Sequence, residues 1–290
     1  MTIDAQRREA LLAAVSAIAV AAGAEVMAVY DSDFAVSAKA DRSPVTDADE
    51  NAEKLIVAAL RGLTPDIPVV AEERAARGEV PAIDGGRFWL VDPLDGTREF
   101  VARNGEFTVN IALIDGGVPA LGAVHLPAAA RLYAGAVGLG ATVREGEAPA
   151  QAIAARTPPA GGVHVVASRS HLDAETEAFI AALPPAGLAY AGSSLKFCLL
   201  AEGAADLYPR FGRTREWDTA AGQAVLLAAG GSVATLAGAP LGYGKPGFVN
   251  PAFVARGRAG GEAPQAGGGA PGAGSRIKSG AGSGPPLPRG

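Results

Sequence analysis

The chain has 290 residues, a formal net charge of −5 and 49% hydrophobic residues, which allows one large domain or two small ones around a sizeable core. The negative charge gives no electrostatic footprint for nucleic acid and no polybasic stretch for a membrane surface. Its single cysteine, Cys198, excludes a disulfide framework and a zinc site built on cysteines, so we expect a cytoplasmic protein, peripheral association with the inner membrane being left open.

The first predicted element is a helix over residues 4–29. Its apolar stretch, "LLAAVSAIAVAAGAEVMAVY", is rich in alanine and contains Glu25, and the residues before it carry no net positive charge. A signal peptide begins with a cationic segment and has a more strongly apolar centre. We therefore expect a helix that packs on the core, and no integral membrane segment.

A second helix is predicted over residues 46–60, with Asp49 and Glu50 in its first turn. A short apolar run that ends in acids follows at 68–73, and then come strands at 87–92, 107–114, 119–126 and 131–138. The two strands joined by "DGG" carry a hairpin signal. Further along, the pattern predicts a strand at 163–168, helices at 173–183 and 193–203, a strand at "ADLYPRF" and a helix at 217–231.

Hairpins dominate the first part of the chain and alternating elements the second. This predicts an α/β (α+β) fold in two halves, an N-terminal α+β half over residues 1–140 and a C-terminal α/β half over residues 141–257. The remaining residues, 258–290, are rich in Gly and Pro, and only Ile277 and Leu287 are large and apolar. Such a segment buries too little surface to offset its ordering entropy, so we predict a disordered tail.

Four acidic residues lie where predicted elements end or begin: Glu72, Asp92, Asp95 and Asp218. Carboxylates that directly follow a buried strand are costly unless something compensates their charge. A divalent cation does so, and such oxygens are the ligands that Mg²⁺ prefers. In "DPLDGT", Pro93 fixes the chain between the aspartates, the Leu94 carbonyl can be a neutral ligand, and Gly96 lets a phosphate approach the backbone.

Each of these acids also has an ordinary structural explanation. "DP" and "DG" are common turn dipeptides, and Glu72 suits a solvated loop. Asp218 suits a helix start because the macrodipole favours a negative charge there. Thr46 and Asp49 have the spacing of a capping box, in which Asp49 would only complete the start of the helix.

Several stretches together resemble the inositol monophosphatase superfamily of lithium-sensitive, magnesium-dependent phosphatases. They are "PVTDAD", "VVAEE", "FWLVDPLDGTREFVARNGEFTVNIALID", "GSSLKFCLLAEGAADLYPRFG" and "WDTAAGQAV". Within that superfamily, the third and fourth are most similar to bacterial 3'(2'),5'-bisphosphate nucleotidases. The similarity runs in register from about residue 8 to residue 256, which implies a layered αβαβα sandwich.

The resemblance also implies roles for individual residues. Glu72, Asp92 and the Leu94 carbonyl would hold one Mg²⁺, and Asp92, Asp95 and Asp218 would hold a second. A third, more weakly bound Mg²⁺ would lie near Glu72. Glu72 is therefore expected to be a catalytic residue as well as a metal ligand. Asp49 and Thr97 would orient and deprotonate the attacking water. Gly96 and Thr97 would offer backbone N–H groups to the phosphate.

The implied substrate is adenosine 3',5'-bisphosphate, cleaved to AMP and phosphate, with 3'-phosphoadenylyl sulfate as a relative. Besides Glu72, Leu94, Asp95, Gly96, Thr97 and Asp218, the residues expected near it are Gly192, Ser193, Ser194, Lys196 and Arg210. His171 is a further candidate for contact. From the residues alone, "GSS" would equally cap the following helix, and both cations would equally be solvated.

Three points stay open in the sequence. Arg74 stands where the family commonly has an acid, which would weaken a third metal. An inositol monophosphatase or other sugar phosphatase with the same metals is the main alternative, while a haloacid-dehalogenase-like start at Asp31 and a non-enzymatic role are weaker ones. The oligomeric state is expected to be monomer or homodimer.

Overall fold

The computed structural model describes residues 4–38, 44–84, 86–183 and 185–259. Apart from residues 258 and 259, the predicted tail lies outside the described residues. Within them the chain forms two main β-sheets and a small two-stranded one made by β1 (Ser37–Ala38) and β2 (Pro44–Val45).

The larger sheet has seven strands in the order β3-β4-β5-β6-β7-β8-β9. They are β3 (Val69–Ala71), β4 (Arg87–Asp95), β5 (Thr108–Asp115), β6 (Val118–Leu126), β7 (Arg131–Ala136), β8 (Gly140–Glu145) and β9 (Gln151–Ile153). β3 runs parallel to β4, and every other neighbouring pair is antiparallel. The predicted hairpin at "DGG" is confirmed, because it joins β5 to β6.

The second sheet has five strands in the order β11-β10-β12-β14-β13. They are β10 (Val163–Ser168), β11 (Pro185–Ala191), β12 (Leu207–Arg210), β13 (Ser232–Thr235) and β14 (Phe253–Arg256). β10 is parallel to both of its neighbours, whereas β12, β14 and β13 pair antiparallel. The larger sheet ends at residue 153 and the smaller sheet begins at residue 163. The division of the chain into two halves at residue 140 stays a prediction.

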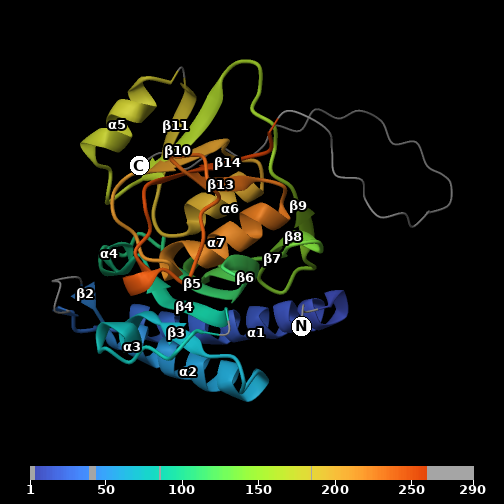
Figure 1. Ribbon diagram of the computed structural model, residues 1–290. Helices are drawn as coiled ribbons and strands as arrows, with labels where there is room; N and C mark the ends of the chain where they lie inside the picture. The colour runs from blue at the N-terminus through green and yellow to red at the C-terminus, as the bar shows by residue number, and fades with distance from the viewer. Residues whose placement is uncertain (1–3, 39–43, 85, 184, 260–290) are drawn as a thin grey trace. The chain divides into compact units, whose positions relative to one another are not determined.

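Helices lie in three layers around these sheets (Figure 1). α1 (Ala5–Tyr30) and α2 (Asp47–Leu63) cover one face of the larger sheet, and α6 (Leu195–Ala201) and α7 (Trp217–Ala228) lie between the two sheets. α5 (Ala174–Ala181) packs on the outer face of the smaller sheet. Short helices α3 (Glu72–Ala76) and α4 (Thr97–Val101), and the 3-10 turns η1 (Pro127–Ala129) and η2 (Pro246–Phe248), complete the predicted αβαβα sandwich, which is confirmed.

The predicted N-terminal helix is confirmed as part of the core. Asp4 caps α1 by accepting a hydrogen bond from the Arg7 N–H at 2.7 Å. Five apolar residues along one face of α1 are fully buried: Leu11, Val15, Ala19, Ala22 and Val26. By length and composition, α1 is the one helix among the described residues that could cross a membrane. Its buried stripe packs instead on α2 and on strands of the larger sheet.

Small residues let α7 lie close against the larger sheet. A Cβ atom added at Gly122 on β6 would come within 2.8 Å of the Ala221 carbonyl, and one at Gly135 on β7 within 2.9 Å of Val225 Cα. These contacts are too short for any side chain, so the two glycines are required for the approach. The close packing fixes the position of α7 and therefore of Asp218 in its first turn.

Candidate active site

A cavity of about 260 Å³ is lined by most of the predicted site residues. Its lining includes Glu72, Leu94, Asp95, Gly96, Thr97, Arg98, Glu99, Ser193, Lys196, Arg210, Arg213 and Asp218. These residues belong to segments that are distant in sequence, and the fold brings them together. These residues therefore share one cavity, while the site and the role of each residue in it stay predictions.

The "DPLDGT" stretch forms an irregular end to β4. The pairing register with β5 shifts between Asp92 and Asp95, so that β4 carries one extra residue there. Asp92 is buried and its Oδ1 accepts a hydrogen bond from the Leu94 N–H at 3.1 Å, while Asp95 faces the cavity. Gly96 follows at φ 90°, a conformation that disfavours side chains, and begins α4. Bulges of this kind commonly re-aim side chains beside active sites.

The two carboxylate oxygens of Asp49 have different partners. Oδ2 accepts hydrogen bonds from the Thr46 N–H at 2.8 Å and from the Thr46 hydroxyl at 2.9 Å, which completes the capping box of α2. Oδ1 lies 3.4 Å from the Thr97 hydroxyl, which is also 3.3 Å from the Leu94 carbonyl. The structural and the catalytic interpretations of Asp49 are therefore compatible.

Three carboxylates, Glu72, Asp95 and Asp218, form what we call the acidic cluster. Burial raises the pKa of Asp95 to about 6, against the opposing effect of the Lys196 ammonium. Burial also raises the pKa of Asp218 well above its usual value, and the charges of Asp95 and Glu72 raise it further. Mutual repulsion of buried carboxylates is the situation that a bound divalent cation relieves.

The donor set suits Mg²⁺, since every side chain in the acidic cluster offers hard carboxylate oxygens. The Leu94 carbonyl lines the same cavity as a possible neutral donor. Within the described residues, no set of three or more His, Cys, Asp or Glu side chains already has the spacing of a metal site. The ligand chemistry therefore fits, and the coordination itself stays a prediction.

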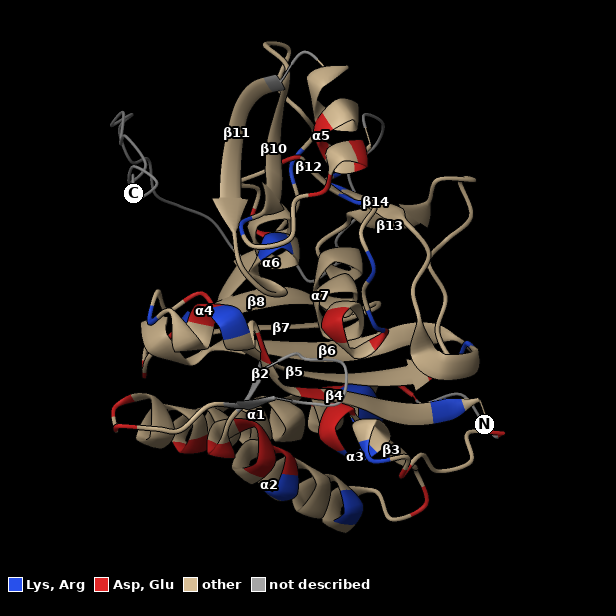
Figure 2. Cartoon of the chain, turned by 90° about the vertical axis from the view of Figure 1, so that its left-hand side faces the viewer, with Lys and Arg blue, Asp and Glu red and all other residues tan. Residues whose placement is uncertain are grey.

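Four cations, Arg98, Lys196, Arg210 and Arg213, form what we call the basic cluster of the same cavity. Lys196 is 4% exposed, and its ammonium donates to the carbonyls of Ala191 at 3.2 Å and Ser193 at 2.5 Å. Burial lowers the pKa of Lys196 to about 8, while the nearby Asp95 charge opposes that shift. Figure 2 shows acidic positions on α3 and at the start of α7, and basic positions on α4 and α6.

Two of the residues expected near the substrate, Gly192 and Ser194, support the cavity without lining it. A Cβ atom at Gly192 would come within 2.6 Å of the Glu106 carbonyl, and its N–H donates to Glu106 Oε2 at 2.8 Å. Ser194 begins α6 but makes no capping bond, because its hydroxyl donates to the Asp218 carbonyl at 2.6 Å. Ser194 therefore does not cap α6 through its side chain and instead ties α6 to α7, whereas the Ser193 hydroxyl accepts a hydrogen bond from the N–H of Leu195, the first residue of α6, at 3.4 Å.

A family model described as the inositol monophosphatase family matches residues 6–264. The chain belongs to the inositol monophosphatase family. It is 49% identical over 235 residues to the 3'(2'),5'-bisphosphate nucleotidase CysQ of Escherichia coli K12, covering 80% of this chain and 94% of that protein. It is 40% identical over 250 residues to the protein of the same name from Buchnera aphidicola, covering 82% of this chain and 90% of the other.

Solved structures of the inositol monophosphatase family have the same fold. The crystal structure of CysQ from Bacteroides thetaiotaomicron superposes with a TM-score of 0.72 at 37% identity, covering 87% of this chain and 98% of that one. The inositol monophosphatase from Anabaena gives a TM-score of 0.68 at 28% identity, covering 86% and 90%. The resemblance read from the sequence motifs is therefore confirmed.

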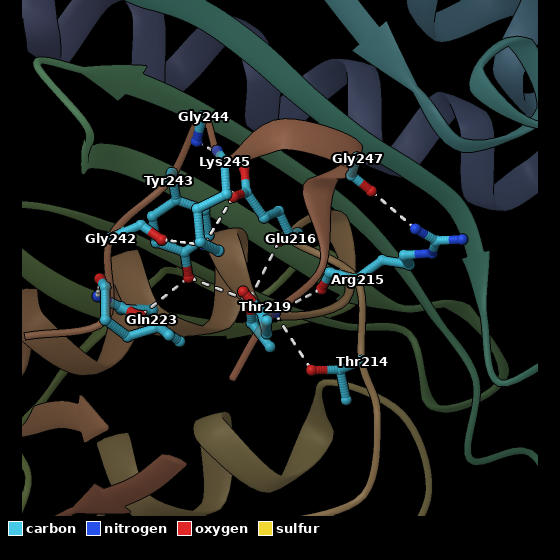
Figure 3. A network of polar contacts seen from close by, with 12 residues as sticks. Thr214, Arg215, Glu216, Thr219, Gln223, Gly242, Tyr243, Gly244, Lys245 and Gly247 are labelled. Atoms are coloured by element: carbon cyan, nitrogen blue, oxygen red, sulfur yellow. Dashed lines mark hydrogen bonds and ion pairs between the residues drawn. The ribbon is translucent and has the colours of Figure 1, made fainter. Parts of the chain in front are cut away.

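In this family member a buried glutamate holds the start of α7, a role that the sequence did not reveal. Glu216 is fully buried, and its carboxylate accepts hydrogen bonds from the N–H groups of Gly244 at 2.7 Å and Lys245 at 2.9 Å. The Lys245 ammonium lies 2.6 Å from the same carboxylate (Figure 3). These contacts fasten the segment after β13 to the helix that carries Asp218.

Further contacts extend this network on both sides of the helix. The Tyr243 hydroxyl lies 3.1 Å from Thr219 Oγ1 and 2.9 Å from Gln223 Oε1, and the Arg215 side chain donates to the Gly247 carbonyl at 2.7 Å (Figure 3). The Arg215 N–H also donates to Asp218 Oδ2 at 2.8 Å. The backbone around Asp218 is therefore held from several directions.

A second buried glutamate, Glu53 on α2, holds the start of α3. Its Oε2 accepts hydrogen bonds from the N–H groups of Glu73 at 2.6 Å and Arg74 at 3.3 Å. Since Glu72 is the first residue of α3, this cap fixes where the Glu72 backbone lies. The Arg74 guanidinium pairs with Glu79 at 2.9 Å, so its charge is partly compensated within the protein.

Proposed function

We propose that this protein is a magnesium-dependent phosphatase that hydrolyses the 3'-phosphate of adenosine 3',5'-bisphosphate to AMP and phosphate. The sulfated relative, 3'-phosphoadenylyl sulfate, would be a second substrate. The observation that carries the proposal is one cavity that holds both an acidic and a basic cluster, in a chain similar to bisphosphate nucleotidases. Such a cavity suits a substrate with two phosphates, one held through metal ions and one held by protein cations.

The acidic cluster, with Asp92 and the Leu94 carbonyl, would hold two Mg²⁺ ions, and a third would lie near Glu72. When bound, the ions neutralise the transferring phosphoryl group and lower the pKa of a coordinated water. The chain's own contribution is to hold these oxygens in place through the bulge at Asp92, the cap from Glu53 and the network around Glu216.

Thr97 and Asp49 would orient the attacking water and accept its proton. Asp49 is 1% exposed, its Oδ2 takes part in the capping box, and its Oδ1 lies within reach of the Thr97 hydroxyl, through which it would receive the proton. The backbone N–H groups of Gly96 and Thr97 lie beside the same cavity and would contact the phosphate.

Lys196 and Arg210 would contact the second phosphate, with Ser193 lining the cavity beside them. Gly192 and Ser194 would act by shaping the wall. His171 also lines the cavity. Burial lowers the pKa of His171, as do the charges of Arg210 and Arg98, so at neutral pH it would offer an uncharged ring to the nucleoside.

An inositol monophosphatase with the same metals is the second candidate, favoured by the family match and by the Anabaena structure. The test is phosphate release by the purified chain from adenosine 3',5'-bisphosphate and from inositol 1-phosphate, with and without Mg²⁺ and Li⁺. We expect faster turnover of the bisphosphate, dependence on Mg²⁺ and inhibition by Li⁺. Faster turnover of inositol 1-phosphate would overturn the choice of substrate. We further propose a cytoplasmic monomer or homodimer.

A further inference from the structure

The four members of the basic cluster differ in how far the protein already uses them. Arg210 is 8% exposed, and its guanidinium donates to the carbonyls of His171 at 2.7 Å and Arg213 at 3.3 Å. Lys196 is also buried and donates to two carbonyls, with its ammonium 5.3 Å from the centre of the Tyr208 ring. Both cations therefore already donate to carbonyl groups of the protein, although the buried Nε of Arg210 has no partner among the described residues.

Arg98 and Arg213, in contrast, are exposed while lining the same cavity. Neither guanidinium has an ion pair with a carboxylate anywhere in the described part of the chain. Their donors are free to bind a ligand without breaking a contact of the protein.

The two arginines come from separate parts of the fold. Arg98 lies in α4, directly after Thr97, and the charges of Arg98 and Arg210 both act on His171. Arg213 lies in the loop between β12 and α7, where its carbonyl is held by Arg210. Both segments adjoin elements that carry the acidic cluster, so the fold brings the two arginines to the same cavity as that cluster.

We propose that Arg98 and Arg213 form a cationic pair that selects substrates with a second phosphate. The proposal rests on the proposed function and extends it to residues that neither the sequence motifs nor the buried contacts reveal. A guanidinium binds phosphate oxygens through two parallel N–H groups, and it costs little desolvation when the group stays exposed. The pair would therefore contribute to binding of the second phosphate, and not to cleavage of the first.

The test compares two substrates that differ only in the second phosphate: adenosine 3',5'-bisphosphate and adenosine 3'-monophosphate. Steady-state kinetics are measured for the wild type and for Arg98→Gln/Arg213→Gln. We expect kcat/KM for the bisphosphate to fall about tenfold or more, mainly through KM. For the monophosphate it should stay within about twofold, because the phosphate that the pair binds is missing.

Two further variants serve as controls. Arg7→Gln/Arg61→Gln removes the same charge from exposed positions on α1 and α2, and it should leave the ratio of the two kcat/KM values unchanged. Arg98→Lys/Arg213→Lys keeps the charge and should retain part of the preference for the bisphosphate. The wild-type preference should also shrink as salt is added, since exposed charges are screened.

Equal losses on both substrates, no loss on either, or the same loss in the Arg7/Arg61 control would each overturn the role of the pair. If the wild type releases no phosphate from either nucleotide, the proposed function itself fails, and this inference falls with it. If the wild type cleaves both nucleotides and only the pattern among the arginine variants differs from expectation, the proposed function stands and the inference alone is wrong.

Discussion

The acidic and basic clusters share one cavity but are built differently. Asp95 and Asp218 are half-buried in the cavity wall, desolvation raises the pKa of both, and the Asp95 charge raises the pKa of Asp218 further. The buried cations Lys196 and Arg210 instead donate to carbonyl oxygens, although Arg210 Nε has no partner among the described residues, and the other two cations are exposed. The acidic cluster therefore needs an external cation to be fully ionised, whereas the basic cluster is ready to accept an anion.

Removing one carboxylate of the acidic cluster should have the largest effect on activity. In Asp95→Asn we expect turnover of adenosine 3',5'-bisphosphate to fall by about a thousandfold or more, because a carboxylate that would bind Mg²⁺ at the reacting phosphate is lost. Phosphate release at saturating Mg²⁺ measures the effect. The pKa of Lys196 should also fall in this variant, because the Asp95 charge raises it in the wild type.

A matched control for this variant lies at the opposite end of the paired strand. Asp95 pairs in register with Thr108 at one end of β5, while Asp115 at the other end forms an ion pair with Arg87 at 2.8 Å. Asp115→Asn should therefore leave turnover within about twofold, as a part-exposed ion pair contributes little. Near-normal rates in Asp95→Asn would contradict the metal-binding interpretation.

The support of the acidic cluster can be weakened without touching its carboxylates. Glu216→Gln keeps a hydrogen-bond acceptor but leaves the Lys245 ammonium without its counter-charge. We expect the free energy of unfolding to fall by about 2–4 kcal/mol, since one partner of a buried charge pair is lost. The Mg²⁺ concentration for half-maximal activity should also rise a few-fold, because the start of α7 carries Asp218.

Denaturant unfolding and Mg²⁺ titrations of activity measure the two effects. Glu145→Gln is the control, because Glu145 is exposed and its ion pair with Arg131, at 3.2 Å, should contribute less than about 1 kcal/mol. A Glu216 variant as stable as this control would show that the network does not hold the helix. Lost stability with unchanged Mg²⁺ dependence would separate the fold from the metal site.

The acids of the cavity could be predicted because they interrupt apolar strands, which is a local pattern. The apolar run "FWLV" is followed directly by Asp92 and Asp95, and the register shift of β4 lies between these two aspartates. Asp49 carried two interpretations in the sequence, and only the structure shows that its two oxygens have separate partners, so that the two interpretations are compatible. Local patterns thus predicted acids that the fold brings to one cavity, but not how the Asp49 carboxylate is divided between two hydroxyl-bearing partners.

Residues that act across elements could not be found in the same way. Asn110 lies opposite Asp92 in the pairing of β4 and β5, and its amide is 3.3 Å from Asp95 and 3.0 Å from Ser194. The signal in the sequence was a polar residue in the apolar run "FTVNIALI". Glu216 carried no comparable signal, since its partners lie in a loop that follows about 28 residues later.

Parts of the second sheet were missed for a related reason. β11 has the sequence "PAGLAYA", whose glycine and alanines are poor strand formers. It is a strand because it pairs in parallel with β10 along that strand's length. β13 and β14 likewise depend on pairing with each other. Their conformation is set by tertiary contacts, which a local pattern does not contain.

The smallest effect at neutral pH is expected outside the cavity, at His125. This histidine is 6% exposed between α1 and β6, with Nδ1 3.1 Å from the Ala19 carbonyl. Burial lowers the pKa of His125 to about 4, although the Ala19 carbonyl opposes the shift. The unfolded chain, with an ordinary histidine pKa of about 6.5, therefore takes up the proton first as the pH falls.

His125 therefore leaves the free energy of unfolding unchanged above a pH of about 6.5, and lowers it by up to about 3 kcal/mol as the pH falls toward about 4. Denaturant unfolding of the wild type and of His125→Gln across this range isolates that contribution, because only the variant should lack it. Equal slopes in the wild type and in His125→Gln would show that His125 takes up its proton in the folded state as readily as in the unfolded one. Since His125 lies away from the active-site cavity, phosphatase activity at neutral pH should not change in His125→Gln. His125 thus differs from the carboxylates of the acidic cluster, because a bound cation would compensate their charge whereas no ligand compensates the protonated histidine.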